Sequence, residues 1–397
     1  MRGRRDKLRV ALIGVGWPLT LYLANALRAR GLDVLLLTAG KAFPAKRLKP
    51  WLHAEHIASV DSPEAHWRYR ELAEDPAVTW IYPLTEPAIA ACHQAIGGSP
   101  KLFPSLSAET LALIVSKQNV SAFARQHGLA TPASNPAASK DDAVSIARAL
   151  GYPVVVKGQG GNSGARVAIC RDEAAVRDSY DAMSAFDPFV EAYIEGETWI
   201  AGGFFLNGRA IRLQICRAVE TDPPKVGHSL EVEHEAPEAL RSATLKFYQA
   251  LRWTGYANAD FIRAADGQFY FLESNPRPWG SMVAAEAVGI PMFDAAADHF
   301  LGKTPKVDLA DGGGRRCYVM PDCLETAINR QGPLGLVRML LDPRLWRGYP
   351  RRYARANAYF LRALYWPLHR WWRERRPGVN GVGAGLSPIG RRQPAAD

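Results

Sequence analysis

The sequence contains few cysteines, and none of them stands in a metal-binding arrangement. Its five cysteines lie far apart, and no two of them form a CxxC motif. Scattered cysteines in odd number are typical neither of the disulfide framework of a small secreted domain nor of a zinc site. We therefore expect buried thiols in a reducing compartment, which indicates a cytoplasmic protein.

Long apolar runs are missing as well. No window holds the ~20 uninterrupted apolar residues that a membrane-spanning helix requires. Residues 10–27 are mostly apolar, and Ala24-Asn25-Ala26 is similar to a signal-peptidase site. However, Gly14, Gly16 and Pro18 interrupt the stretch, and the pattern continues as strand, helix and strand. We therefore expect a folded unit here and not a cleaved leader.

Two common enzyme signatures are incomplete. The nine histidines form no HxxxH or HExxH pattern, which argues against a helical zinc site. The Gly14-x-Gly16 turn lacks the third glycine of a dinucleotide-binding loop and has Leu19 in its place. A nicotinamide enzyme is therefore the weaker interpretation. We interpret residues 1–106 as a Rossmann-like domain, a small parallel sheet covered by helices.

Length and charge set further limits. A chain of 397 residues is too long for one typical core, and 48% apolar with 22% charged residues indicates a globular protein. The net charge is +10, and residues 338–376 hold 11 arginines against Asp342 and Glu374, a local balance of +9. Because no recognition motif accompanies this charge, we expect no nucleic-acid partner.

A predicted hairpin in residues 256–275 places two carboxylates together. If Asp266-Gly267 forms a tight turn, Asp260 lies directly opposite Glu273, with Cβ atoms roughly 5 Å apart. Asn275 projects from the same face, and three such oxygen ligands suit Mg²⁺. The alternative is a hairpin with solvent-exposed acids.

A second motif joins a cation to a glycine-rich loop. Val154-Val155-Val156-Lys157 reads as a buried strand, and residues 158–166 contain four glycines. Such a loop can bend its backbone N–H groups around phosphate oxygens, although it is not a Walker A loop. An ordinary strand-end lysine and a flexible hairpin remain the alternative.

Taken in order, these motifs resemble the ATP-grasp superfamily, in particular the branch similar to the large chain of carbamoyl-phosphate synthase. The resemblance covers residues 107–302, about half of the chain. The matching motifs are Lys117 on its helix, Val-Val-Val-Lys157 with its loop, Glu191-Ala-Tyr-Ile-Glu-Gly, Asn-Ala-Asp260-Phe and Leu-Glu273-Ser-Asn275-Pro-Arg277.

The resemblance implies an α/β and α+β fold in several parts. An ATP-grasp domain of two α+β subdomains is expected at 107–305, with a lid at about 117–188 and a hinge at about 189–198. A basic, aromatic-rich helical segment is expected at 306–376. The tail at 377–397 has the composition of a disordered segment.

The resemblance also implies roles for single residues. ATP and Mg²⁺ (or Mn²⁺) are the expected cofactors, and Asp260, Glu273 and Asn275 are the expected metal ligands. Lys157 and Arg277 are the expected catalytic residues. The expected nucleotide contacts are Lys117, Lys157, Gly160, Gly161, Ser163, Gly164, Glu191 and Glu197. Glu197 lies one position before the usual ribose-binding acid, where this chain has Thr198.

The implied reaction is ATP-dependent ligation of a carboxylate to an amine or thiol through an acyl phosphate, with release of ADP and phosphate. The alternative is a non-catalytic, membrane-associated ATP-binding protein of a surface-glycan or metabolite assembly system. The expected partners are small carboxylates and amines, and the sequence does not indicate an oligomeric state.

Two regions are open to different interpretations. Arg212, Arg217 and Lys225 lie in the family's substrate-facing region, but Pro223-Pro224 beside them could equally form a surface turn. Residues 345–376 interleave arginines with tryptophans and tyrosines. Such a segment either contacts an anionic membrane at its inner, cytoplasmic face or packs on the protein core.

Overall fold

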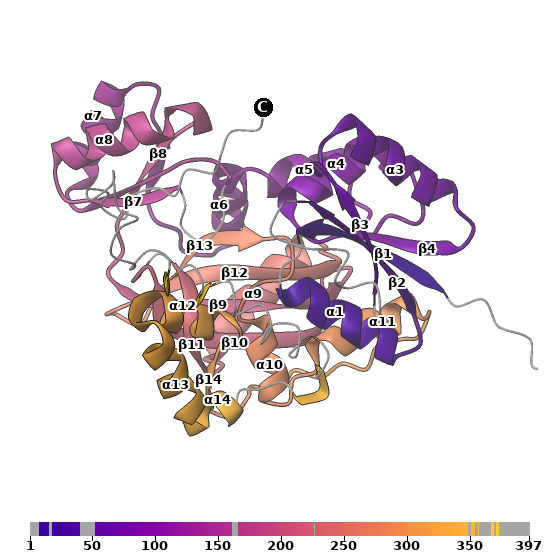
Figure 1. Ribbon diagram of the computed structural model, residues 1–397. Helices are drawn as coiled ribbons and strands as arrows, with labels where there is room; N and C mark the ends of the chain where they lie inside the picture. The colour runs from indigo at the N-terminus through magenta and orange to yellow at the C-terminus, as the bar shows by residue number, and fades with distance from the viewer. Residues whose placement is uncertain are drawn as a thin grey trace, which may run out of the picture.

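Three β-sheets organise the described part of the chain (Figure 1). The computed structural model describes residues 8–15, 18–39, 52–160, 166–225 and 227–347, with 351–353, 356, 367–368 and 371–372. A six-stranded sheet lies at the centre, with a four-stranded N-terminal sheet on one side and a second four-stranded sheet on the other.

The N-terminal sheet is parallel and has the strand order β3-β2-β1-β4. Its strands are β1 (Arg9–Val15), β2 (Asp33–Ala39), β3 (His53–Ile57) and β4 (Val78–Pro83). Its helices are α1 (Pro18–Ala29), α3 (Pro63–Glu74) and α4 (Glu86–Ile96). Alternate residues of β1 and β2 enter two different hydrophobic clusters. Both faces are therefore covered, which explains why these strands read as continuous apolar runs.

The six-stranded sheet is antiparallel, in the order β13-β12-β9-β10-β11-β14. Its strands are β9 (Gly196–Leu206), β10 (Arg209–Asp222), β11 (His228–His234), β12 (Gly255–Ala264), β13 (Phe269–Asn275) and β14 (Arg316–Tyr318). A tight hairpin at Asn207-Gly208 joins β9 to β10, because Leu206 pairs with Arg209 and both loop residues have positive φ. That geometry is typical of a type I′ turn.

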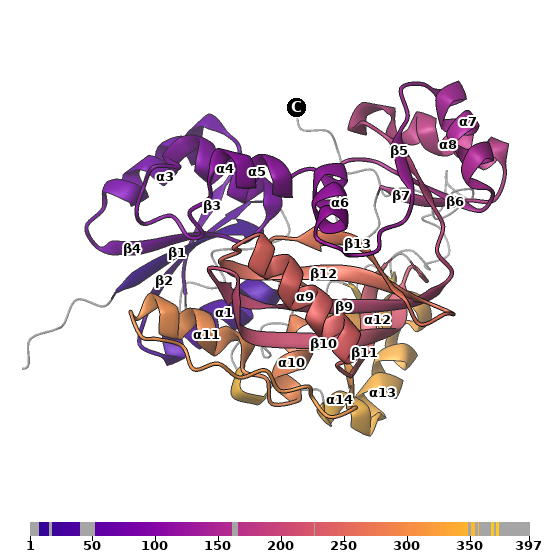
Figure 2. The ribbon, with the colours of Figure 1, turned by 180° about the vertical axis from the view of Figure 1, so that it is seen from behind.

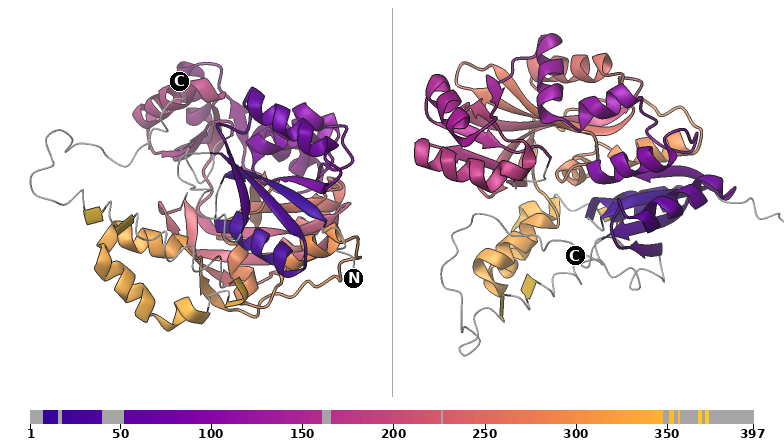
Figure 3. Two further views of the ribbon diagram at one scale, coloured as in Figure 1. Left: turned by 45° about the vertical axis from the view of Figure 1, so that its right-hand side comes forward. Right: turned by 90° about the horizontal axis from the view of Figure 1, so that it is seen from above.

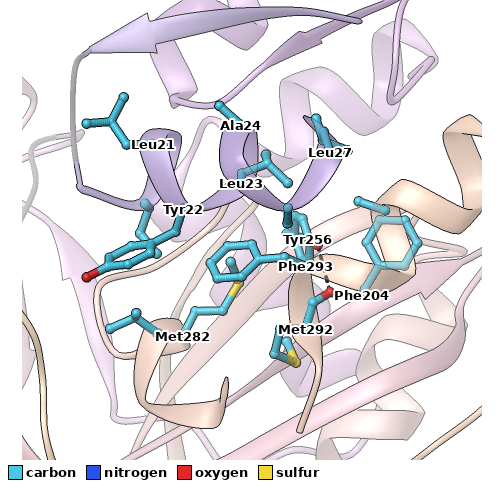
Figure 4. Packing of buried hydrophobic residues seen from close by; sticks show 14 of the residues in the cluster. Leu21, Tyr22, Leu23, Ala24, Leu27, Phe204, Tyr256, Met282, Met292 and Phe293 are labelled. Atoms are coloured by element: carbon cyan, nitrogen blue, oxygen red, sulfur yellow. Dashed lines mark hydrogen bonds between the residues drawn. The ribbon is translucent and has the colours of Figure 1, made fainter. Parts of the chain in front are cut away.

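The two faces of this sheet carry different layers (Figure 2). One face packs against α5 (Ala108–Ile114), α6 (Lys117–Gln126) and α9 (Glu238–Ala250). The other packs against α1, α10 (Met282–Ala287) and α11 (Met292–Phe300), in the cluster drawn in Figure 4. There Tyr256 of β12 donates a hydrogen bond to the carbonyl of Met292 at 2.8 Å. This cluster joins the N-terminal layer to the central sheet.

The third sheet forms a small separate layer. Its strands are β5 (Ser134–Pro136), β8 (Phe189–Ala192), β6 (Val154–Lys157) and β7 (Val167–Cys170), covered by α7 (Lys140–Leu150), α8 (Glu173–Met183) and the 3₁₀ turn η1 (Ser184–Phe186). Its core runs from Ala137 to Val190. Helix α6 packs instead on the central sheet, through Val120 and Ala124. The compact layer therefore begins after α6, later than the expected start of the lid at residue 117.

The region after Gly314 forms one short strand and three helices up to Arg347. β14 adds an edge strand beside β11, and α12 (Asp322–Gln331), α13 (Pro333–Leu341) and α14 (Pro343–Arg347) follow. A 3₁₀ turn, η2 (Arg351–Tyr353), brings Tyr353 against Tyr22 and Phe293.

Other expectations for the C-terminal region are not testable here. Most of residues 348–376 of the expected helical segment, and the whole tail at 377–397, lie outside the described residues. Within the described residues, no helix is both long and apolar enough to cross a membrane.

Candidate active site

The β12–β13 hairpin carries the predicted carboxylates, and its register differs from the simplest expectation. Asp260 lies opposite Glu273, as predicted, but the loop has three residues and not two, since Ala264 pairs with Gln268. The pairing is therefore shifted by one residue near the turn, and a bulge at Leu272 restores it before Glu273. The predicted pairing of Asp260 with Glu273 is confirmed, but the two-residue loop from which it was predicted is wrong.

Four polar side chains meet on one face of this hairpin. Asn258 donates to Asp260 at 2.9 Å, and the Asn275 amide lies 3.4 Å from both Asp260 and Glu273. Burial and the neighbouring Glu273 carboxylate raise the pKa of Asp260 to about 8. Burial also disfavours the charged form of Glu273, but Lys117, Lys157 and Arg277 outweigh it and lower the pKa of that carboxyl. The pair thus holds closely spaced negative charge that a cation would stabilise.

Helix α6 brings the first predicted lysine to these acids. The hydroxyl of Ser116 caps the helix by accepting a hydrogen bond from the backbone N–H of Asn119 at 3.3 Å. Lys117 follows at the first helical position, and its Nζ lies 3.4 Å from Glu273 Oε2. Its backbone N–H donates to the side chain of Gln159, just beyond β6, at 3.1 Å. The lysine therefore lies where the small layer meets the hairpin.

The second predicted lysine approaches from the small layer. Lys157 ends β6 and is buried, and its Nζ lies 2.5 Å from Glu191 of β8. It also lies close enough to lower the pKa of Glu273. Of the predicted loop contacts, Gly160 is described and has a positive φ, whereas Gly161, Ser163 and Gly164 lie outside the described residues.

Arg277 meets an acid that the sequence analysis did not assign to the site. Its Nε donates to both carboxylate oxygens of Glu86 at 2.8 Å, and one terminal nitrogen donates to Asn275 at 3.1 Å. Glu86 is the first residue of α4 and follows the Pro-Leu-Thr stretch at the end of β4. A strand end of the N-terminal sheet therefore reaches the site, and an acid directly after an apolar strand was the available signal.

A buried polar network supports the loop that carries Arg277. The indole of Trp279 donates to Gln214 Oε1 at 3.2 Å, and Gln214 Nε2 lies 3.0 Å from His234 Nε2 and from the backbone carbonyl of Ser281. His234 Nδ1 lies 3.3 Å from the carbonyl of Arg315. All three side chains are buried. The loop is thus fixed from β10 and β11, the next strands across the sheet.

His234 predicts a pH dependence of stability. Burial lowers the pKa of His234 from 6.5 to about 4. Between these two pH values the imidazole is protonated in the unfolded chain and neutral in the folded chain. The contribution of His234 to the free energy of unfolding is therefore fully present above pH 6.5. It is lost as the pH drops toward 4, which lowers the free energy of unfolding by roughly 2 to 3 kcal/mol. Urea unfolding at a series of pH values between these limits measures the slope. His234→Gln should flatten it and His53→Gln, at an exposed position, should not; an equal slope in the His234 variant would contradict the assignment.

The remaining predicted residues make other contacts. Glu197 lies 3.1 Å from Arg217, which shares a sheet face with Trp199 on the α9 side, opposite to Asp260. Lys225 contacts Tyr193 and Glu195 at 3.1 Å, and Arg212 is buried and donates to the carbonyls of Ile211 and Lys306. The structure therefore does not gather Arg212, Arg217 and Lys225 beside the hairpin, and their substrate role stays a prediction.

The donor set of the hairpin fits a hard divalent cation. Within the described residues, no group of three or more His, Cys, Asp or Glu side chains could hold a metal. Asp260 and Glu273 are only two carboxylates, and amide oxygens would complete the set. Asn258 Oδ1 is buried and accepts no hydrogen bond from the described residues. This oxygen, next to Asp260, is therefore available to a metal ion. Carboxylate and amide oxygens are the ligands that Mg²⁺ prefers.

Comparison with known proteins agrees with this geometry. Residues 116–304 match the family described as carbamoyl-phosphate synthase L chain, ATP binding domain. The large chain of carbamoyl phosphate synthase from Gemmatimonas aurantiaca is 25% identical over 238 residues, which cover 56% of this chain and 20% of the relative. The large chain from Pyrobaculum aerophilum is 29% identical over 195 residues, 45% of this chain and 19% of the relative. The chain thus spans about a fifth of the length of these relatives.

Solved structures share the fold over more of the chain. Biotin carboxylase from Campylobacter jejuni has a TM-score of 0.60 at 17% identity, covering 76% of this chain and 73% of that one. N5-carboxyaminoimidazole synthetase from Staphylococcus aureus, complexed with ADP, has a TM-score of 0.63 at 17% identity, covering 75% and 79%. Residues 116–304, just under half of the chain, therefore resemble the ATP-binding domain of the carbamoyl-phosphate synthase large chain in sequence, and the solved structures share the fold.

Proposed function

We propose that this chain is an ATP-dependent ligase that joins a carboxylate to an amine or thiol. A carboxylate oxygen of the substrate attacks the γ-phosphorus of ATP, which forms an acyl phosphate and releases ADP. The amine or thiol then attacks the acyl carbon, the C–O bond to phosphate breaks, and the nucleophile loses its proton. Phosphorylation converts a poor leaving group into a good one.

The observation that carries this proposal is the convergence of three cations on one acidic pair. Lys117, Lys157 and Arg277 come from three different elements, and all three lower the pKa of Glu273 beside Asp260. Cations and acids at this spacing can hold a triphosphate and the metal ion that accompanies it. A purely structural ion pair would need only one cation.

Each side chain then has a defined task. Lys117 and Lys157 bind phosphate oxygens as point charges, and Glu191 holds Lys157 in place from β8 while its strand contacts the adenine. Gly160, Gly161, Ser163 and Gly164 cover the phosphates. Arg277 binds the transferred phosphoryl group, with Glu86 fixing its guanidinium.

Asp260, Glu273 and Asn275 would hold Mg²⁺ or Mn²⁺, with Asn258 beside them. The bound ion supplies neutralisation of charge on the β- and γ-phosphates. Burial and the adjacent Glu273 carboxylate raise the pKa of Asp260, so the two negative charges oppose each other. A divalent ion would allow both carboxylates to be ionised.

A second candidate is a non-catalytic ATP-binding protein with the same fold. It differs in one testable respect, because it would bind nucleotide without turnover. The retention of Lys157, Asp260, Glu273, Asn275 and Arg277 favours the ligase, since binding alone does not require a residue at the transferred phosphoryl group.

A screen for ADP release tests the proposal. The chain is incubated with ATP and Mg²⁺ and with carboxylates and amines in pairs, and ADP, AMP and phosphate are measured. We expect magnesium-dependent ADP and phosphate in equal amounts with the correct pair. AMP formation would contradict the acyl phosphate route, and tight MgATP binding with no turnover across the screen would support the non-catalytic protein.

A further inference from the structure

Helix α13 is apolar on all sides, which is unusual for a helix at the surface. Its nine residues, Pro333–Leu341, include a single charged side chain, Arg338. A helix that is hydrophobic all round is normally buried in a core or in lipid. Here it packs against α12 at the outer edge of the molecule, where Figure 1 labels both helices on the side away from the N-terminal sheet, and Figure 3 shows the same region in gold.

One side of α13 is covered by its neighbours. Leu336, Met339 and Leu340 pack against the cluster formed with α12 and β14. Gly335 allows the two helices to approach closely, since a Cβ there would lie 2.2 Å from the carbonyl oxygen of Ala327. The inward side therefore fixes α13 firmly on α12.

The other side of α13 is exposed. Leu334, Val337 and Leu341 follow helical spacing and are 56%, 50% and 77% exposed. Trp346 is 45% exposed, and its indole donates to the carbonyl of Leu340 at 2.8 Å, which holds the ring at the C-terminal end of the stripe. We call these four side chains the α13 surface. A contiguous exposed apolar patch of this kind marks an interaction site.

Two exposed arginines lie at the α13 surface. Arg338 lies within it and Arg347 directly follows Trp346, whereas the neighbouring Arg344 is paired with Glu231 and Asp342. Residues 338–376 account for +9 of the net charge of +10. Aliphatic side chains, tryptophan and arginine together are the composition of helices that lie in a membrane interface among anionic headgroups.

We propose that the α13 surface docks onto an anionic phospholipid bilayer. A second copy of the chain is the weaker occupant, because it would bring two strongly positive segments together. Residues 377–397 are also poor in large apolar side chains, with only Val379, Val382, Leu386 and Ile389. The bilayer covers the apolar stripe and neutralises the arginines at the same time. This inference does not depend on the proposed ligase activity.

Sedimentation of the full chain with vesicles tests the proposal. We expect binding to vesicles of equal parts phosphatidylcholine and phosphatidylglycerol, little binding to phosphatidylcholine alone, and weakening in high salt. Leu334→Glu with Leu341→Glu should reduce binding by about tenfold or more, since two charges enter the apolar layer. Both side chains are exposed, so the fold should be retained.

A matched control uses another exposed apolar side chain. Trp67 of α3 is 59% exposed, and Trp67→Glu should leave vesicle binding unchanged. Equal binding by the double variant and the unchanged chain would overturn the proposal, as would equal binding to neutral vesicles. A dimer in sedimentation velocity that the double variant abolishes would assign the surface to a second copy instead, and binding of RNA lost in the same variant would assign it to nucleic acid.

Discussion

Replacing Glu273 by glutamine is expected to lower magnesium-dependent ADP release by about a hundred- to a thousandfold. The variant keeps the shape of the side chain but removes the charge that faces Lys117 and lies opposite Asp260. A cation between the strands would lose one anionic ligand, and Lys117 would lose its charged partner. Initial rates at several magnesium concentrations measure the effect.

A second readout separates metal binding from turnover. In the unchanged chain, MgADP should raise the melting temperature more than ADP without metal does, because ligands that bind only the folded state stabilise it. Glu273→Gln should lose the magnesium-dependent part of this shift. Glu238→Gln removes an exposed carboxylate at the start of α9 and should change neither readout. Wild-type rates in the Glu273 variant would remove the metal assignment.

The sequence predicted the opposition of Asp260 and Glu273 correctly, but from a turn geometry that holds only in part. Opposition of Asp260 and Glu273 follows from a two-residue turn, but the chain uses three loop residues and later a bulge at Leu272. Each feature shifts the register by one residue, and the two shifts cancel. A turn dipeptide alone cannot reveal a bulge several residues away, because the bulge depends on packing of the neighbouring strands.

Contacts between distant elements were harder to predict. Lys117 and Lys157 were identified from local motifs, and the structure places both near Glu273. Glu86 was missed because its importance arises only when the N-terminal layer docks on the central sheet. Nothing in the residues around position 86 encodes the distance to Arg277, which lies 191 positions later.

The C-terminal region was predicted in part. Three helices, α12, α13 and α14, lie within the segment where helices were expected, but β14 was not predicted. β14 has only three residues, too few for a clear alternating pattern. Its place is set by pairing with β11, which is a tertiary contact. The exposed stripe of α13 was missed because an apolar run of this length reads as buried core.

Replacing Arg277 by alanine is expected to cost about a thousandfold or more in the rate of ADP release, with a much smaller change in ATP affinity. The guanidinium contacts Glu86 and Asn275, so it lies at the hairpin and not beside Lys157 at the end of β6. An arginine in that position stabilises charge that develops during phosphoryl transfer, which affects the rate more than binding. Arg277→Lys should recover little, because an ammonium cannot reproduce the planar, forked geometry.

The variant Glu86→Gln separates the arginine's chemistry from its position. The amide can still accept one hydrogen bond from Arg277 Nε but carries no charge, so the guanidinium should be held less firmly. We expect a moderate fall in kcat with an unchanged melting temperature, because Glu86 is a positioning residue in this account. If Glu86→Gln lowered kcat as much as Arg277→Ala, the acid itself would have to contact the substrate. If Arg277→Ala raised the KM for ATP and left kcat intact, the arginine would bind the nucleotide in the ground state, and its assignment to the transferred phosphoryl group would be wrong.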